Sequence, residues 1–195
     1  PFRFDLTPPV ITLTSKTTNP PTFPKQTWDF RAQDAGGLSS MKVMVHGHTI
    51  QSASWPTFYV PDETLTDVKV DLDQLGVPDG LQGVVFTATD NAGNVATRVV
   101  NLIQDNTGPE VCSLTSTTYS DPSYRVFTMT ARDDGIGLAT KRLYENGVGL
   151  IASFSSPAGS GVPHTGSWSQ AFPVGMHTVH LGCTDKWGNY RSSQD

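Results

Sequence analysis

An internal repeat constrains the fold of this chain more than any other feature of its sequence. Residues 89–94 read Thr-Asp-Asn-Ala-Gly-Asn, and residues 184–189 read Thr-Asp-Lys-Trp-Gly-Asn. Apolar and polar residues alternate ahead of each copy, with the period of two that a half-buried strand requires. The Asp, Asn and Gly residues then favour a tight turn. One copy in each half of the chain predicts two domains of the same fold.

The leading segments of the two halves also match. Residues 5–9 read Asp-Leu-Thr-Pro-Pro, residues 105–109 read Asp-Asn-Thr-Gly-Pro, and the segment after each ends in Leu-Thr-Ser. Proline fixes φ and cannot donate to a sheet ladder, so it suits a stiff segment ahead of an edge strand. We therefore place the two domains at residues 1–104 and 105–195, and we expect the last strand of the second domain to be truncated.

Short strands separated by turns are predicted for the rest of each half. Residues 28–32 and 127–131 alternate large apolar side chains with polar ones, and Gly and Pro recur at close intervals, which argues against long helices. In the less regular middle of each half we expect strands around residues 58–60 and 68–70, and a loop over residues 153–167. The pattern predicts an all-β fold of two tandem immunoglobulin-like (Ig-like) β-sandwich domains.

The repeat resembles bacterial Ig-like repeats and the related hyalin repeat. The residues that carry the resemblance are 8–11, Pro-Pro-Val-Ile, and 172–179, which lead into the Asp-x-x-Gly-Asn loop at residues 185–189. The resemblance covers both halves almost end to end. It implies an extracellular module of the kind found in tandem in adhesins, surface proteins and the non-catalytic regions of secreted enzymes. Hyalin repeats usually place a second cysteine after the Gly-Asn loop, whereas Cys183 precedes it here.

The two cysteines of the chain both lie in the second half. Alignment of the halves puts Cys112 where the first half has Ile11, and Cys183 where it has Ala88. Both positions face the core, on the first and sixth strands, which a sandwich can bring together near one end. We predict a disulfide between them, which would indicate an oxidising compartment; a pair of reduced buried thiols is the alternative.

Aspartates recur at three places in each half that an Ig-like sandwich brings to one pole: the leading segment, the end of the second strand, and the loop between the sixth and seventh strands. The predicted groups are Asp5, Asp34 and Asp90 in the first domain, and Asp105, Asp133, Asp134 and Asp185 in the second. Clustered carboxylates repel one another unless a cation joins them, and oxygen ligands from loops suit Ca²⁺. We expect the second group at the joint between the domains, where an ion would fix their angle. The alternative is turn chemistry alone, in which the carboxylates only accept backbone hydrogen bonds.

Composition argues against several classes of function. A net charge of −5 offers no basic surface for nucleic acid, and no apolar run approaches the roughly 18 residues needed to span a membrane. The chain has no Gly-x-Ser-x-Gly motif, and its glutamates are limited to Glu63, Glu110 and Glu145. We therefore expect no enzymatic activity.

Aromatic residues suggest a second function. Trp55 and Tyr59 form an aromatic stretch, and Trp187 replaces Ala92 in the repeated loop. Such rings can stack on sugars, although Trp55 can equally pack in the core and Trp187 against a neighbouring domain. The sequence thus predicts a non-catalytic extracellular module, on a cell surface or secreted, that acts in adhesion or as a calcium-stiffened spacer of a larger protein. Its expected partners are a protein or carbohydrate at a cell surface and neighbouring domains. The alternative is a carbohydrate-binding accessory module of a secreted hydrolase or protease.

Overall fold

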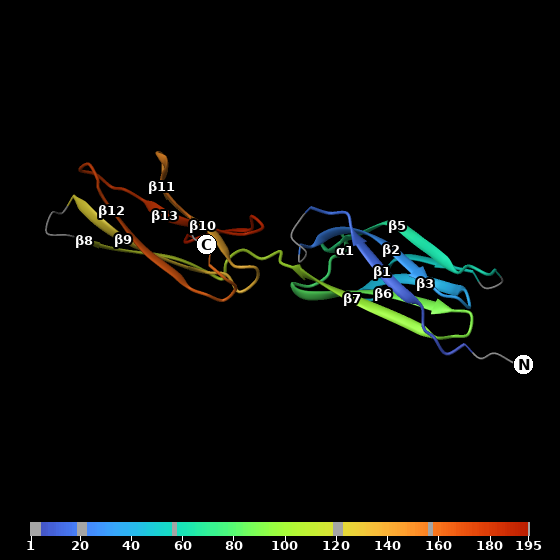
Figure 1. The fold of residues 1–195 in the computed structure, drawn as a ribbon. Coiled ribbons are helices and arrows are strands. Elements are labelled where there is room, and N and C mark those ends of the chain that lie inside the picture. Colours follow the sequence, from blue (N-terminus) through green and yellow to red (C-terminus); the bar gives the residue numbers. More distant parts are fainter. Residues whose placement is uncertain (1–4, 19–22, 56–57, 119–122, 156–157, 195) are drawn as a thin grey trace, which may run out of the picture. The chain divides into compact units, whose positions relative to one another are not determined.

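A computed structural model describes residues 5–18, 23–55, 58–118, 123–155 and 158–194. The chain separates into two compact units, unit 1 from Pro1 to Gln104 and unit 2 from Asp105 to Asp195, coloured blue to green and yellow to red in Figure 1. Each unit has its own hydrophobic core. None of the helices in the described part of the chain is long and apolar enough to cross a membrane.

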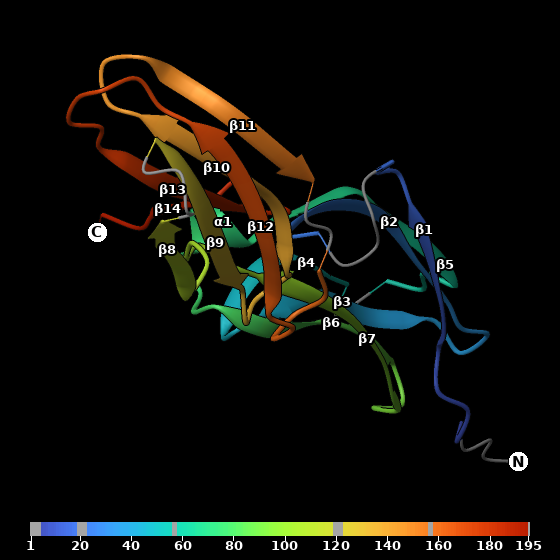
Figure 2. The ribbon, with the colours of Figure 1, turned by 90° about the vertical axis from the view of Figure 1, so that its left-hand side faces the viewer.

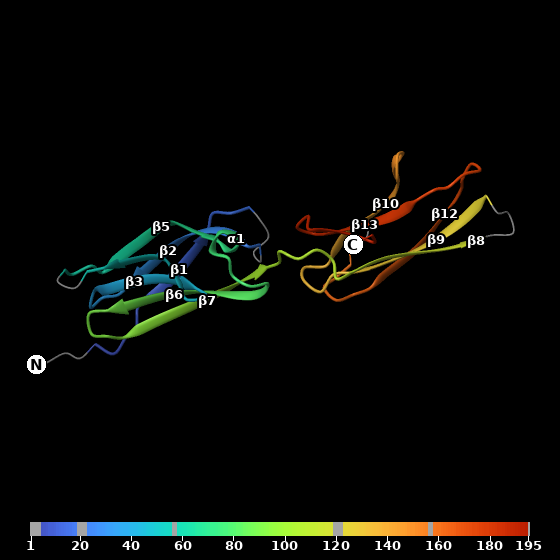
Figure 3. The same ribbon diagram turned by 180° about the vertical axis from the view of Figure 1, so that it is seen from behind.

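Unit 1 is a sandwich of two antiparallel sheets, which Figure 3 shows from behind. One sheet has the order β1 (Val10–Ser15), β2 (Lys25–Gln33), β5 (Asp62–Asp71). The other has the order β4 (His48–Ser54), β3 (Leu38–Val45), β6 (Gly80–Asp90), β7 (Val95–Gln104), and a short helix, α1 (Leu72–Leu75), follows β5. The predicted alternation of β2 buries Trp28 and Phe30, whose rings meet Phe86 of β6 edge-on at centroid distances of 5.5 and 5.4 Å. This inter-sheet packing is the centre of the core.

Unit 2 repeats this topology (Figure 2). One sheet has the order β12 (His164–Ala171), β9 (Tyr124–Arg132), β8 (Val111–Thr118). The other has the order β11 (Gly149–Ser155), β10 (Leu138–Glu145), β13 (Val179–Asp185), β14 (Tyr190–Ser192). The register is the same in both units, because Leu38 pairs with Asp90 and Leu138 with Asp185. Positions in unit 2 can therefore be matched one by one with positions in unit 1. The sheet orders confirm the predicted all-β fold of two Ig-like sandwiches.

The middle of each half differs from the sequence prediction. Residues 153–167, expected to be a loop, contain the end of β11 and the beginning of β12, while residues 58–60, expected to be a strand, are not one. Strand β4 was missing from the prediction. The reason is that β4, β11 and β12 are all edge strands. An edge strand packs on one neighbour only and tolerates Ser, Gly and charged residues, so the apolar alternation is weak there.

Candidate functional site

The structure gathers the predicted aspartates into one cluster in each unit. The cluster of unit 1 comprises Asp5, Asp34 and Asp90, and the cluster of unit 2 comprises Asp105, Asp133 and Asp185; within each, carboxylate oxygens lie within 4.8 Å of one another. Asp134 is not part of the second cluster. It is exposed and forms an ion pair with Arg132 at 2.9 Å. The expected convergence at one pole therefore holds for every predicted carboxylate except Asp134, which follows the cluster residue Asp133 and faces solvent.

The repeated Asp-x-x-Gly-Asn loop closes on its own aspartate. In unit 2, Oδ1 of Asp185 accepts hydrogen bonds from the N–H groups of Trp187, Gly188 and Asn189 at 2.7–2.9 Å. In unit 1, Oδ1 of Asp90 accepts from Ala92 and Asn94. Burial raises the pKa of Asp90, but these bonds and those from the Asn94 side chain outweigh it and hold the pKa below its usual value. This part of each cluster is accounted for by turn chemistry.

The asparagine that ends each loop has a further role that the sequence interpretation missed. The side-chain amide of Asn94 donates to the backbone oxygen of Asp5 at 3.0 Å, and that of Asn189 donates to the backbone oxygen of Asp105 at the same distance. Each asparagine also donates to Oδ2 of its own loop aspartate. The asparagine therefore fixes the leading segment of the unit beside the loop. The sequence signal was its recurrence at the same place in both halves.

A glycine in each unit lets the leading aspartate approach the corner after the second strand. A Cβ atom on Gly36 would lie 2.2 Å from Oδ2 of Asp5, and one on Gly135 would lie 1.9 Å from Oδ2 of Asp105. Either contact is far inside van der Waals distance, so any side chain there would displace the carboxylate. Both glycines follow a cluster aspartate by two positions, which is the pattern that could have identified them.

The cluster of unit 2 is the more deeply buried of the two. Asp105, Asp133 and Asp185 expose 3%, 0% and 1% of their surface. Oδ2 of Asp133 accepts the N–H of Gly137 at 2.5 Å, whereas its Oδ1 is buried with no hydrogen-bond partner among the described residues. A buried carboxylate oxygen without a partner costs free energy that a bound cation would recover. In unit 1, by contrast, Oδ1 of Asp34 accepts the N–H of Gly36.

The pKa values of two aspartates in this cluster are raised. Burial raises the pKa of Asp133 to about 6, and the negative charges of Asp105, Glu110 and Asp185 add to it against the hydrogen bond from Gly137. Burial also raises the pKa of Asp105, with a further contribution from Asp185. Among the described residues of unit 2, the ion pairs join Arg132 with Asp134 and His177 with Glu145, and none of them includes a carboxylate of the cluster. Three buried carboxylates with oxygen-only donors match the preference of Ca²⁺, a hard cation that takes carboxylate and carbonyl oxygens in flexible geometry.

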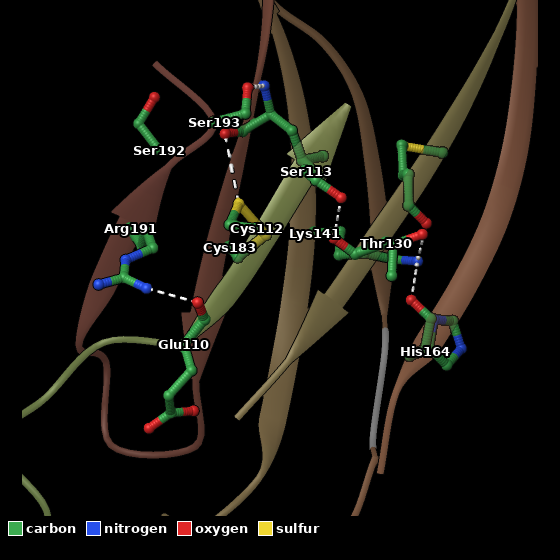
Figure 4. The surroundings of a disulfide bond; sticks show 12 residues. Glu110, Cys112, Ser113, Thr130, Lys141, His164, Cys183, Arg191, Ser192 and Ser193 are labelled. Carbon is green, nitrogen blue, oxygen red and sulfur yellow. Dashed lines mark hydrogen bonds between the residues drawn. A yellow bond between two sulfur atoms is a disulfide. The ribbon is translucent and has the colours of Figure 1, made fainter. Parts of the chain in front are cut away.

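The predicted disulfide is present in unit 2. Cys112 of β8 and Cys183 of β13 are bonded, with their Cα atoms 5.8 Å apart and 71 positions apart in sequence (Figure 4). The bond joins the two sheets of the sandwich. Their counterparts in unit 1 are the apolar residues Ile11 and Ala88, as the strand registers require.

The three predicted aromatic ligand contacts have different surroundings. Trp55 is partly buried and packs against the core of unit 1. Tyr59 is 67% exposed, and its hydroxyl donates to the backbone oxygen of Ala35 at 3.0 Å. Phe58 beside it is also exposed, and Trp187 is partly buried in its loop. Packing therefore explains Trp55, and Tyr59 with Phe58 remains as the exposed aromatic pair of unit 1.

No protein-family model matches the chain, and no curated protein matches its sequence. Among solved structures, the chain is similar to the fibronectin(III)-like modules of Clostridium thermocellum CbhA, with 13% identity, 93% of this chain and 91% of that chain covered, and a TM-score of 0.38. It is also similar to dimeric latent PorU from Porphyromonas gingivalis, with 13% identity, 96% of this chain covered and a TM-score of 0.35. The chain spans 20% of the length of that second protein.

Proposed function

We propose that this chain is a non-catalytic extracellular spacer of a larger protein, and that calcium bound to Asp105, Asp133 and Asp185 stiffens it. The observation that carries the proposal is the fully buried Oδ1 of Asp133, which has no hydrogen-bond partner among the described residues and lies in a group of three buried carboxylates. Without a cation, this arrangement combines desolvation with like-charge repulsion. A divalent cation removes both costs.

The position of Asp105 in the sequence gives the ion a mechanical role. Asp105 is the first residue of unit 2 and follows Gln104, the last residue of β7 in unit 1. An ion that binds Asp105 together with Asp133 and Asp185 therefore fastens the connecting chain to two loops of unit 2. Loss of the ion leaves this connection to the hydrogen bonds of Asp105 with Thr107, Ile136 and Asn189, so the segment should bend more easily without calcium.

The disulfide supports an extracellular setting for this function. Disulfides form and persist in oxidising compartments, and the bond between Cys112 and Cys183 joins the two sheets of unit 2. Extracellular calcium is abundant enough to fill a site of modest affinity, such as those of extracellular modules. The disulfide and a bound calcium ion would both stiffen a protein that spaces or presents other domains outside the cell.

The test is a calcium titration of the complete chain by calorimetry, thermal unfolding and small-angle scattering. We expect calcium to raise the unfolding temperature of unit 2 and to lengthen the particle, and Asp133→Asn to remove both effects because it keeps the side-chain shape and removes the charge. Asp34→Asn is the matched control in unit 1, because Asp34, unlike Asp133, has no fully buried oxygen without a hydrogen-bond partner among the described residues. An unchanged unfolding temperature at millimolar calcium would contradict the proposal.

A second candidate function is carbohydrate binding, which the exposed pair Phe58 and Tyr59 favours. Tyr59 is held in place by its hydrogen bond to Ala35, so its ring forms a fixed exposed surface on which a sugar can stack. Affinity electrophoresis in polysaccharide gels tests this function. Retardation that Tyr59→Ala abolishes, and that Tyr124→Ala in unit 2 leaves unchanged, would support it; unretarded migration in every gel would exclude binding to those polysaccharides.

A further inference from the structure

His177 of unit 2 closes the loop over residues 172–178, which joins β12 to β13 at the end of β13 opposite to Asp185. Nε2 of His177 lies 2.9 Å from the backbone oxygen of Pro173, at the other side of this loop. Nδ1 lies 2.5 Å from Oε1 of Glu145, the last residue of β10. One side chain therefore closes the loop on itself and ties it to the neighbouring strand.

Both partners of this imidazole are hydrogen-bond acceptors. A backbone oxygen cannot donate, and neither can an ionised carboxylate. Neutral histidine has a single N–H, so it can satisfy one of the two partners and must turn a lone pair toward the other. Only the imidazolium, with both nitrogens protonated, forms both bonds. The geometry therefore selects the charged form of His177, and loss of one proton makes one of the two contacts repulsive.

The ring of His177 also lies beside an aromatic residue of the core. Its centroid is 5.0 Å from that of Phe172, which is within the range of a cation–π contact. Phe172 is 9% exposed and meets Phe127 of β9 edge-on at a centroid distance of 5.9 Å. The charged imidazole is thus attracted to a ring that anchors the same loop in the core.

Two charged side chains, one of each sign, act on His177 from neighbouring strands. Glu145 of β10 accepts its hydrogen bond, and Arg125 of β9 lines the same cavity as the imidazole, where its positive charge opposes protonation. The residues of β8 that line this cavity are uncharged. The bond to Glu145 outweighs burial and raises the pKa of His177 above its usual value of 6.5.

Unit 1 makes the same closure with a side chain that does not titrate. The strand registers match Gln82 with His177 and Pro78 with Pro173. Nε2 of Gln82 donates to the backbone oxygen of Pro78 at 2.7 Å. Strand β7 pairs with this stretch of β6, so the closure does not depend on an open sheet edge. At the position of Glu145, unit 1 has an apolar residue. Unit 2 therefore replaces an uncharged donor by a titratable one and adds an acidic partner.

We propose that His177 is a pH-sensitive clasp: its imidazolium holds the 172–178 loop against β10 through Glu145 and Pro173, and deprotonation releases the loop. Because the pKa of His177 is higher in the folded state than the usual 6.5, the stabilisation is complete below pH 6.5 and is lost as the pH rises through the folded-state pKa. The clasp lies at the other end of β13 from Asp185, so the inference does not depend on the calcium site.

The test follows the proton of His177 and the order of the loop by NMR in the complete chain. Asp133→Asn is the background, because Asp133 itself titrates in this pH range. Nitrogen-15 shifts of the imidazole report the protonation of each ring nitrogen, and relaxation of the backbone carbons reports the order of residues 173–178. We expect both nitrogens to be protonated at about pH 5, and one proton to be lost with a pKa above 6.5. The order of the loop should fall with the same midpoint, whereas residues 77–82 of unit 1 should keep theirs.

Three variants in the same background separate the clasp from simple packing. His177→Gln copies Gln82 of unit 1 and should keep the loop ordered at every pH, whereas His177→Ala should leave it mobile at every pH. Glu145→Gln removes the negative charge and should lower the pKa of His177. A pKa of His177 at or below 6.5 in the parent chain would overturn the proposal, and so would loop order that does not change with pH. Equal pH dependence in His177→Gln and in the parent would overturn it as well.

Discussion

Lys141 occupies in unit 2 the position that Met41 occupies in unit 1. Lys141 pairs with Cys183 as Met41 pairs with Ala88, and each side chain is 1% exposed. The ammonium group of Lys141 donates to the backbone oxygens of Met129 and His164, at 3.4 and 3.1 Å, and the second of these bonds is drawn in Figure 4. Burial lowers the pKa of Lys141. One repeat therefore has an amine in its core where the other has a thioether.

The first prediction is that Lys141→Met stabilises unit 2 at neutral pH. The exchange removes a buried amine whose charged form is poorly solvated, and unit 1 shows that methionine fits this position of the fold. We expect a gain on the order of 1–2 kcal/mol in the free energy of unfolding. Calorimetry of the complete chain measures it. Met41→Lys is the matched exchange in unit 1 and should destabilise that unit; a lower unfolding temperature for Lys141→Met would contradict the prediction.

The second prediction concerns pH in the absence of calcium. The pKa of Asp133 in the folded protein, about 6, lies above its usual value of 3.8, so the folded state holds this proton more tightly than the unfolded state does. The resulting stabilisation is complete below pH 3.8 and is lost as the pH rises through 6. With a chelator present, unit 2 should lose on the order of 2–3 kcal/mol from this group between pH 4 and pH 7.

Asp133→Asn should flatten this part of the pH profile of unit 2, because the amide does not titrate. Calcium should flatten it as well by favouring the ionised carboxylate. Denaturant unfolding at several pH values, with chelator and with calcium, measures both effects. A wild-type profile that coincides with that of Asp133→Asn would show that Asp133 titrates normally.

The acidic clusters could be predicted from sequence because they depend on topology alone. In an Ig-like sandwich of seven strands, the leading segment, the end of the second strand and the loop between the sixth and seventh strands lie at one pole. Asp5, Asp34 and Asp90 occupy these three places, so they converge regardless of the exact strand bounds. The unpaired Oδ1 of Asp133 could not be predicted, because hydrogen bonding depends on the path of the Gly135–Gly137 corner.

The burial of Lys141 shows the limit of the alternation argument. A register shift between Leu138 and Thr140, matched between Leu38 and Ser40 in unit 1, changes which side chains of the strand face the core. The period of two from Leu143 places position 141 on the core face, as Val43 does for Met41, but a lysine is ordinarily expected at the surface. The interior backbone oxygens that accept its hydrogen bonds come from two other strands, and their positions are a tertiary property.

The third prediction tests the close approach of Asp105 to the corner of unit 2. Gly135→Ala should abolish the calcium response and lower the unfolding temperature of unit 2, because the added Cβ would lie 1.9 Å from Oδ2 of Asp105 and force the carboxylate away. Gly159→Ala is the control in the same unit, since the nearest atom to its Cβ would be 3.7 Å away. Calcium titration of both variants by calorimetry measures the effect. An unaltered affinity in Gly135→Ala would mean that Asp105 is not a ligand.

The fourth prediction compares the two ways in which the units join their first and sixth strands. Unit 2 uses the disulfide, whereas unit 1 has Ile11 and Ala88 at these positions. The double variant Cys112→Ile, Cys183→Ala should therefore fold, because it copies a pair that the same topology already accommodates. It loses the cross-link, which constrains the unfolded chain over 71 positions, and this should cost about 2–5 kcal/mol.

Differential scanning calorimetry, with and without a reductant, measures this cost. In the wild type, reduction should lower the unfolding temperature of unit 2 and leave that of unit 1 unchanged. In the double variant, the reductant should have no effect on either transition. The replacement of sulfur by aliphatic carbon preserves most of the buried apolar surface, so a variant that is no less stable than the oxidised protein would show that packing at this site outweighs the cross-link. In that case the disulfide would mainly slow the unfolding of unit 2 rather than raise its free energy of unfolding. Unfolding rates in denaturant would reveal this effect.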